Sequence, residues 1–122
     1  MKAFFIVMLL FTLLSVAIFA NLSYIDNLTR TLAEDLERLP SPHEYTTAEK
    51  AERIRDTWQD NKRFVQITVN HTEIEFISNT ATELCVFARQ KNVAEFERAR
   101  HILINALEEL RFSEKLSLIN IL

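Results

Sequence analysis

The chain has 122 residues, a formal net charge of −3, a single cysteine and no glycine. This length accommodates one domain, with enough residues for a modest core without metals or disulfides. The absence of glycine argues against hairpin-rich β folds, phosphate-binding loops and nucleophile elbows, which all need backbone conformations that glycine supplies. The charges are of mixed sign and form no basic patch, which argues against nucleic acid as a partner. We therefore expect an all-α protein.

The first predicted element is an apolar helix. After Lys2, an uncharged run extends from Ala3 to Ala20, and as a helix it would span about 27 Å, close to the hydrocarbon thickness of a bilayer. A cleaved signal peptide is the alternative, but its apolar region usually has about 7–15 residues. We therefore predict a transmembrane signal-anchor over residues 1–21. Lys2 places the N-terminus in the cytoplasm and residues 22–122 outside, as a single-pass protein of the cell membrane.

The same helix is predicted to continue beyond the membrane. Leucine and isoleucine recur at spacings of three and four from Leu22 to Leu39, which is typical of one face of an amphipathic helix. Pro40 and Pro42 end this helix, because proline lacks the amide hydrogen and restricts the residue before it. Residues 40–45 form the predicted loop.

Two further helices are predicted between the prolines and Asn92. Thr46 and Glu49 form a capping box that opens the first of them, and its apolar stripe consists of Ala51, Ile54, Trp58 and Val65. Near Phe64 the stripe shifts by one residue, and Asn70 is a good helix cap. We therefore predict a kink or short break near residues 67–70. The stripe that runs across it consists of Phe64, Ile67, His71, Ile74, Ile77, Ala81, Leu84 and Ala88.

The last predicted helix begins after Asn92, which forms a cap signature with Glu95. Its apolar stripe consists of Phe96, Ala99, Leu103, Ala106 and Leu110. A dense apolar segment follows at residues 116–122, which we call the apolar tail. Together these elements predict an N-terminal transmembrane helix that continues into a small antiparallel helical bundle.

His71, Glu73 and Glu75 are the first candidates for a binding site. His71 and Glu75 lie four residues apart on one helix face, so they can form an acid–base pair or half of a metal site. The structural alternative is a partly buried histidine at the bundle kink. It is favoured because a catalytic zinc normally has three protein ligands and no third is visible. We therefore predict no metal, no cofactor and no catalytic residue.

The apolar tail is the second candidate, with Leu116, Leu118, Ile121 and Leu122 as contact residues. These side chains either close the end of the bundle or are offered to a partner. Packing is favoured, because exposed apolar patches are uncommon on monomers. Cys85 permits no internal disulfide, and its apolar neighbours are expected to raise the pKa of the thiol and make it unreactive.

These landmarks together resemble a family of short, single-pass bacterial membrane proteins known as domain of unknown function 4363. The resemblance spans nearly the whole chain and rests on the apolar anchor, Trp58 in a charged helix, Asn70-His71 with Glu73-Ile74, and the closing Leu116-Ser117-Leu118 and Asn120-Ile121-Leu122. The family pattern has an aspartate at the position of Glu75. The resemblance implies an envelope location, in a family typical of spore-forming anaerobic bacteria. It implies no activity, because the family's function is unassigned.

The expected function is that of a non-enzymatic interaction or scaffold module, anchored in the lipid bilayer and binding an unknown envelope protein. One alternative is an extracytoplasmic metal- or ligand-binding domain that uses the His71 region. Another is a secreted helical protein, released by signal cleavage near Asn21.

Overall fold

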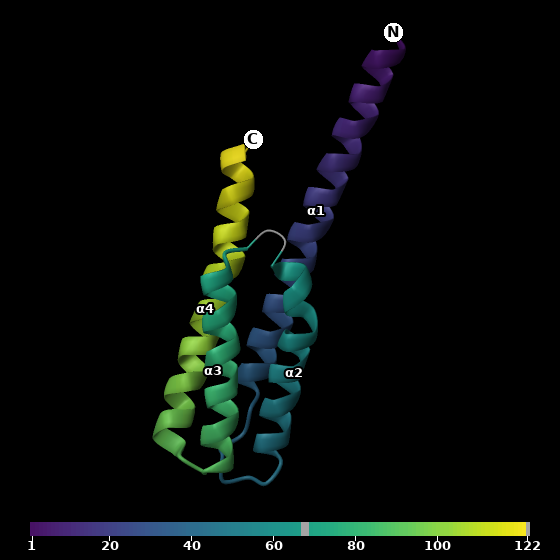
Figure 1. Cartoon of the computed structure of the whole chain (residues 1–122). Coiled ribbons are helices and arrows are strands. Elements are labelled where there is room, and N and C mark those ends of the chain that lie inside the picture. Colours follow the sequence, from purple (N-terminus) through teal and green to yellow (C-terminus); the bar gives the residue numbers. More distant parts are fainter. Residues whose placement is uncertain (67–68, 122) are drawn as a thin grey trace.

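Four helices make up most of the chain. The computed structural model describes residues 1–66 and 69–121, with the backbone alone for Leu118 and Ile121. Within these ranges there is no strand, and the helices are α1 (Lys2–Glu37), α2 (Thr47–Val65), α3 (His71–Arg89) and α4 (Val93–Ile121). They run alternately down and up in a bundle, from which the first half of α1 projects (Figure 1). The predicted all-α fold, with an apolar N-terminal helix that continues into an antiparallel bundle, is confirmed.

The core lies between the four helices and excludes the first half of α1. Trp58 of α2 and Phe96 of α4 are its largest fully buried side chains. Most of the other core residues belong to the predicted stripes, because a spacing of three or four returns to the same face of a helix with 3.6 residues per turn. They include Ile25, Leu32, Leu36, Leu39, Ala51, Ile54, Val65, Ile74, Ile77, Ala81, Leu84, Ala88, Ala99, Leu103 and Leu110.

The helices form a ring in which α1 packs closely on α4 and more loosely on α2. Because the number of antiparallel helices is even, the end of α4 rises on the same side of the bundle as the projecting half of α1 (Figure 1). We call this side the proximal end, and it holds Asp26, Val65 and His71. The opposite side, which holds Leu39 and Arg89, is the distal end.

The predicted break between the second and third helices is present. α2 ends at Val65 and α3 begins at His71, while residues 67 and 68 of the predicted break lie outside the described residues. Phe64 and His71, which the prediction places in the core stripe, are exposed. The reason is that these two residues belong to different helices, so the stripe that begins at Ile74 does not extend back across the break.

The helix starts are where they were predicted, but one cap differs. Asn70 Oδ1 accepts a hydrogen bond from the Thr72 amide at 2.8 Å, and Asn92 Oδ1 accepts one from the Glu95 amide at 3.3 Å. Thr46 precedes α2 as expected, yet its side chain makes no capping hydrogen bond. Its backbone is already helical, with φ −83° and ψ −13°, whereas a capping side chain normally needs an extended backbone to reach the amides of the first turn.

The end of α3 shows how the chain turns without glycine. Lys91 has a φ of 55°, in the left-handed region. The Lys91 amide donates to the Ala88 carbonyl at 3.2 Å and the Asn92 amide donates to the Phe87 carbonyl at 3.1 Å, the two bonds of a Schellman motif. Glycine is usual at this position, because a Cβ atom costs roughly 1–2 kcal/mol in this conformation. The two bonds help to offset that cost.

Arg100 of α4 closes the distal end of α1. Its Nη1 atom donates to the Leu39 carbonyl at 2.6 Å and to the Leu36 carbonyl at 3.4 Å, where the last turn of a helix leaves carbonyls without helical partners. The guanidinium also pairs with Glu97 and lies 5.4 Å from the ring centroid of Phe96. One side chain thus joins the end of α1 to the beginning of α4, and the sequence spacing shows only its pairing with Glu97.

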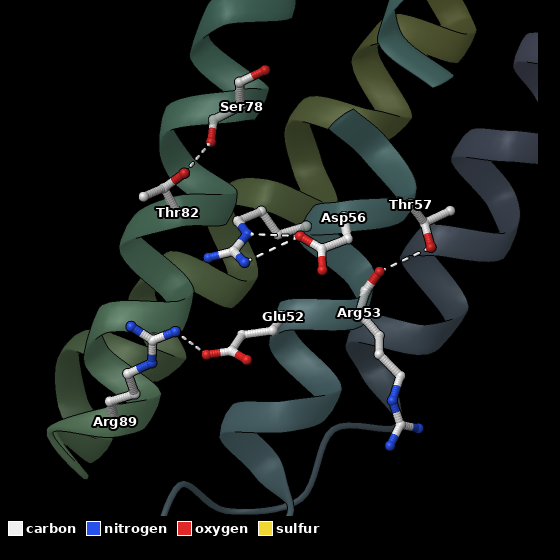
Figure 2. A network of polar contacts seen from close by, with 8 residues as sticks. Glu52, Arg53, Asp56, Thr57, Ser78, Thr82 and Arg89 are labelled. Carbon is white, nitrogen blue, oxygen red and sulfur yellow. Dashed lines mark hydrogen bonds and ion pairs between the residues drawn. The ribbon is translucent and has the colours of Figure 1, made fainter. Parts of the chain in front are cut away.

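Polar side chains join α2 to α3. Arg89 pairs with Glu52 across the two helices (Figure 2). Within α2, Arg55 donates two hydrogen bonds of 3.1 Å to Asp56 Oδ1, and this bonding raises the pKa of the Arg55 guanidinium. In the core between these helices, the indole nitrogen of Trp58 donates to the Ser78 hydroxyl at 2.9 Å. The largest core side chain therefore has its polar atom satisfied, as a buried indole requires.

Candidate functional site

The structure brings His71 and Glu75 together and leaves Glu73 on another face of α3. His71 Nε2 lies 3.8 Å from Glu75 Oε1, and the His71 side chain is 76% exposed. The alternative of a partly buried histidine is therefore wrong, because the first turn of α3 turns this residue towards solvent. Two ligands are fewer than the three that a catalytic zinc normally has. Within the described residues, no group of three histidine, cysteine or acidic side chains is placed to hold a metal ion.

Glu73 lies instead at a hollow between α3 and α4. The hollow has a volume of about 250 Å³, and its lining includes Phe76, Leu110, Glu73 and Glu109. A second hollow of about 320 Å³ shares Phe76 and continues along the same two helices towards Glu95. We call these two hollows the α3–α4 groove. Phe76 is 51% exposed, so the groove offers an aromatic surface. Glu73 and Glu109 border its first hollow, and Glu83, Glu95 and Arg98 border the second.

The apolar tail continues α4 beyond the bundle core. Leu116 is 43% exposed and Ile119 is 65% exposed, so these two side chains do not close the end of the bundle. The side chains of Leu118 and Ile121, and the whole of Leu122, lie outside the described residues. Packing at the end of the bundle was the favoured expectation, and it fails for Leu116 and Ile119 because α4 continues as a helix past its last core residue, Leu110.

At the proximal end, Asp26 is the centre of an ion cluster that was not predicted from the sequence. Asp26 Oδ2 pairs with Arg30 one turn away on α1, a spacing that the sequence shows. Asp26 Oδ1 lies 3.4 Å from Lys115 Nζ and 3.9 Å from Arg111 Nε of α4. This oxygen is buried and has no partner of hydrogen-bond geometry among the described residues, so its contacts with α4 are ion pairs. No local pattern indicates a partner so far along the chain.

Cys85 is placed as an unreactive thiol. It is a free cysteine of α3 and 1% exposed. Burial raises the pKa of its thiol, an effect that the nearby Arg55 partly opposes. The predicted rise of this pKa is confirmed. Because the thiolate is the nucleophilic form, the raised pKa disfavours reaction at this sulfur.

The architecture defines the class of this protein as a helical-bundle domain carried on a long apolar helix. By length and composition α1 could cross a membrane, and none of its most apolar 18-residue window is buried in the bundle. The chain belongs to the family described as Domain of unknown function (DUF4363), whose model matches residues 18–121. This finding confirms the family resemblance. No curated protein and no solved structure matches the chain.

Proposed function

We propose that this protein is a membrane-anchored helical module that stands outside the cell membrane and binds another envelope protein in the α3–α4 groove. In this proposal the first half of α1 crosses the bilayer once, with Lys2 on the cytoplasmic side. The bundle is then held directly above the outer surface. The module performs no chemistry of its own.

The continuity of α1 supports the membrane anchor. The helix runs without interruption from Lys2 to Glu37, so the same element supplies an exposed apolar segment and part of the bundle core. The hydroxyls of Thr12 and Ser15 donate to the carbonyls of Met8 and Phe11, each at 2.9 Å. The two polar side chains of the apolar run are therefore satisfied inside the helix, as a lipid environment requires.

The proposal of protein binding rests on the exposed aromatic surface of the α3–α4 groove. Phe76 is half exposed over buried Ile77 and Leu110, while Glu73 and Glu109 are exposed at the same hollow. An amphipathic helix commonly docks in such a groove by inserting apolar side chains. Charge complementarity then selects a partner whose apolar residues are flanked by lysine or arginine.

Photocrosslinking tests the groove in the full chain in native membranes. We expect a photoreactive phenylalanine analogue at Phe76 to give one discrete adduct, identified by mass spectrometry, and the same probe at distal Tyr45 to give none. Reversing the groove charge with Glu73→Lys and Glu109→Lys should abolish the adduct. The matched pair Glu34→Lys and Glu44→Lys, on exposed residues away from the groove, should leave it intact. Adducts of equal yield at both probe positions, or insensitive to the groove charges, would overturn the proposal.

The anchor and the metal-binding alternative have separate tests. A mature chain that begins near Asn21 and is recovered outside the membrane would replace the anchored module by a secreted one. The metal-binding alternative rests on the His71–Glu75 contact and requires stoichiometric metal on the purified full chain that His71→Ala removes. We expect elemental analysis to find equal, substoichiometric metal on both.

A further inference from the structure

We propose that the end of α4 dips into the same bilayer leaflet through which α1 emerges, so that the protein contacts the membrane at two places. The partner of the apolar tail is then lipid. This inference rests on the proposed membrane anchoring by α1, and it assigns the apolar tail a role separate from the α3–α4 groove.

The position of the tail follows from the ion pairs that join the preceding turns of α4 to α1. Asp26 faces Lys115 and Arg111 of α4, and the two helices are antiparallel. At 1.5 Å per residue, the six residues from Lys115 to Ile121 rise about 9 Å, and the six residues from Asp26 back to Ala20 rise by the same distance. The end of the tail is therefore level with the last turn of the apolar run of α1. Figure 1 shows that the end of α4 and the projecting part of α1 leave the bundle on the same side, apart from one another.

The side chains near this end suit the membrane interface. Phe112, Leu116 and Ile119 are exposed and recur at spacings of four and three, which places them on one face of α4. Leu118 and Ile121 occupy other positions around the same turns, so the apolar character is not confined to a single stripe. Because the end of the tail is level with the end of the apolar run of α1, it lies at the headgroup boundary, where the apolar side chains of interfacial helices are found.

The basic residues that precede the tail are also consistent with a position at the membrane interface. Arg111 and Lys115 precede the tail and pair with Asp26. The Lys115 side chain is nevertheless 53% exposed, so this long basic side chain can also reach lipid headgroups while its stem lies among apolar groups. The bundle does not cover the exposed face, because buried Leu110 and exposed Phe112 lie about 200° apart around the helix. Nor does α1 cover it, since Phe112 is 62% exposed and Ile119 is 65% exposed.

Spin labelling of the full chain measures this placement directly. The protein would be reconstituted in vesicles of phosphatidylethanolamine and phosphatidylglycerol, with a nitroxide on Ile119→Cys or Leu116→Cys. Leu14→Cys serves as the reference inside the membrane and distal Tyr45→Cys as the reference in water. All four side chains are exposed in the fold, so these substitutions should not disturb it. The wild-type chain, with Cys85 buried, is the labelling blank.

Relaxation by oxygen and by a water-soluble nickel chelate then separates the environments. We expect the label at Ile119, which is level with Leu22, to show oxygen and nickel accessibilities between those at Leu14 and Tyr45, with clearly less nickel accessibility than at Tyr45. The label at Leu116 should lie closer to Tyr45. Nickel accessibility at Ile119 equal to that at Tyr45 would overturn the proposal. Protection at Ile119 from both reagents would also overturn it, because protein or a second copy would then cover the tail. If Leu14 itself were accessible to nickel, the anchor and therefore both proposals would fail.

A charge placed in the tail provides a second measurement. With the label kept at Ile119, Leu116→Glu should raise nickel accessibility towards the value at Tyr45, because a carboxylate near the hydrocarbon is strongly disfavoured. Ser113→Glu, one turn lower on exposed surface, is the matched control and should leave the label in lipid. An unchanged label in the Leu116→Glu variant would contradict the proposed depth.

Discussion

The two ends of the bundle are held together by different interactions. At the distal end, Arg100 donates to the carbonyls of Leu36, in the last turn of α1, and Leu39, just beyond it, and Lys91 forms a hydrogen-bonded turn. At the proximal end, α1 and α4 are joined by the ion pairs of Asp26, and apolar side chains such as Phe112 and Ile119 remain exposed. Changes to the polar contacts and buried residues of the distal end should therefore alter the stability of the fold. Changes to the exposed side chains of the proximal end should leave the fold intact, in contrast to changes in proximal core residues such as Val65.

The largest difference should appear between apolar residues at the two ends. Leu36→Ala removes a fully buried distal side chain and should lower the free energy of unfolding by about 2–5 kcal/mol. Ile119→Ala removes an exposed proximal side chain and should change it by less than about 0.5 kcal/mol. Chemical denaturation followed by Trp58 fluorescence measures both. Equal losses would contradict the division between the two ends.

Replacing a cation at each end should give a smaller difference in the free energy of unfolding. Arg100→Met removes the charged donor from the carbonyls that close α1, which should cost about 1.5–3 kcal/mol of stability. Lys115→Met removes one exposed ion pair of Asp26, for which about 0–1 kcal/mol is expected. The same denaturation experiment distinguishes them. A larger loss for Lys115→Met would mean that the proximal ion cluster, and not the distal contact, holds α4 against α1.

Glycine substitution should have opposite signs at the two ends. At distal Lys91 the left-handed backbone favours glycine, so Lys91→Gly should stabilise the fold by up to about 1 kcal/mol, after the entropy of the freer unfolded chain is deducted. At Lys115, inside α4, glycine should destabilise by about 0.5–1 kcal/mol. The shift in thermal midpoint gives the sign. A loss at Lys91 would show that its side chain contributes more than the strain it imposes.

The smallest expected effect concerns the pH dependence from Cys85. Burial raises the pKa of this thiol in the folded state, so the unfolded chain loses its proton first. The contribution to stability is therefore complete below the ordinary thiol pKa of about 8.5 and is lost as the pH rises through the higher folded value. Between about pH 7 and pH 10, stability should fall more steeply in the wild type than in Cys85→Ala. Identical slopes would show that the buried thiol does not couple to folding.

The fold could be predicted from the sequence wherever local spacing decides the structure. The stripes from Ala51 to Trp58 and from Ile74 to Ala88 are buried as predicted, because helical periodicity is a property of neighbouring residues. Asn70 and Asn92 cap their helices for the same reason. The prediction for Thr46 failed because a cap also depends on the backbone conformation of the loop before it.

The candidate site was predicted less well, because its geometry depends on residues far apart in the chain. The spacing of His71 and Glu75 predicts their contact, but only the position of α4 makes Glu73 part of a groove with Glu109. Likewise, the sequence pairs Arg100 with Glu97 and cannot show that its guanidinium reaches Leu39. The missing information is which helices are neighbours in the ring.

The amino-acid sequence by itself determined the helices, their buried faces and the length of the apolar run, since each depends on residue types at short spacings. The tertiary structure alone decided that Lys115 meets Asp26 and that α4 ends on the side of the bundle from which the first half of α1 projects. Both follow from packing four helices antiparallel in a ring, an arrangement that returns α4 to the side on which α1 enters.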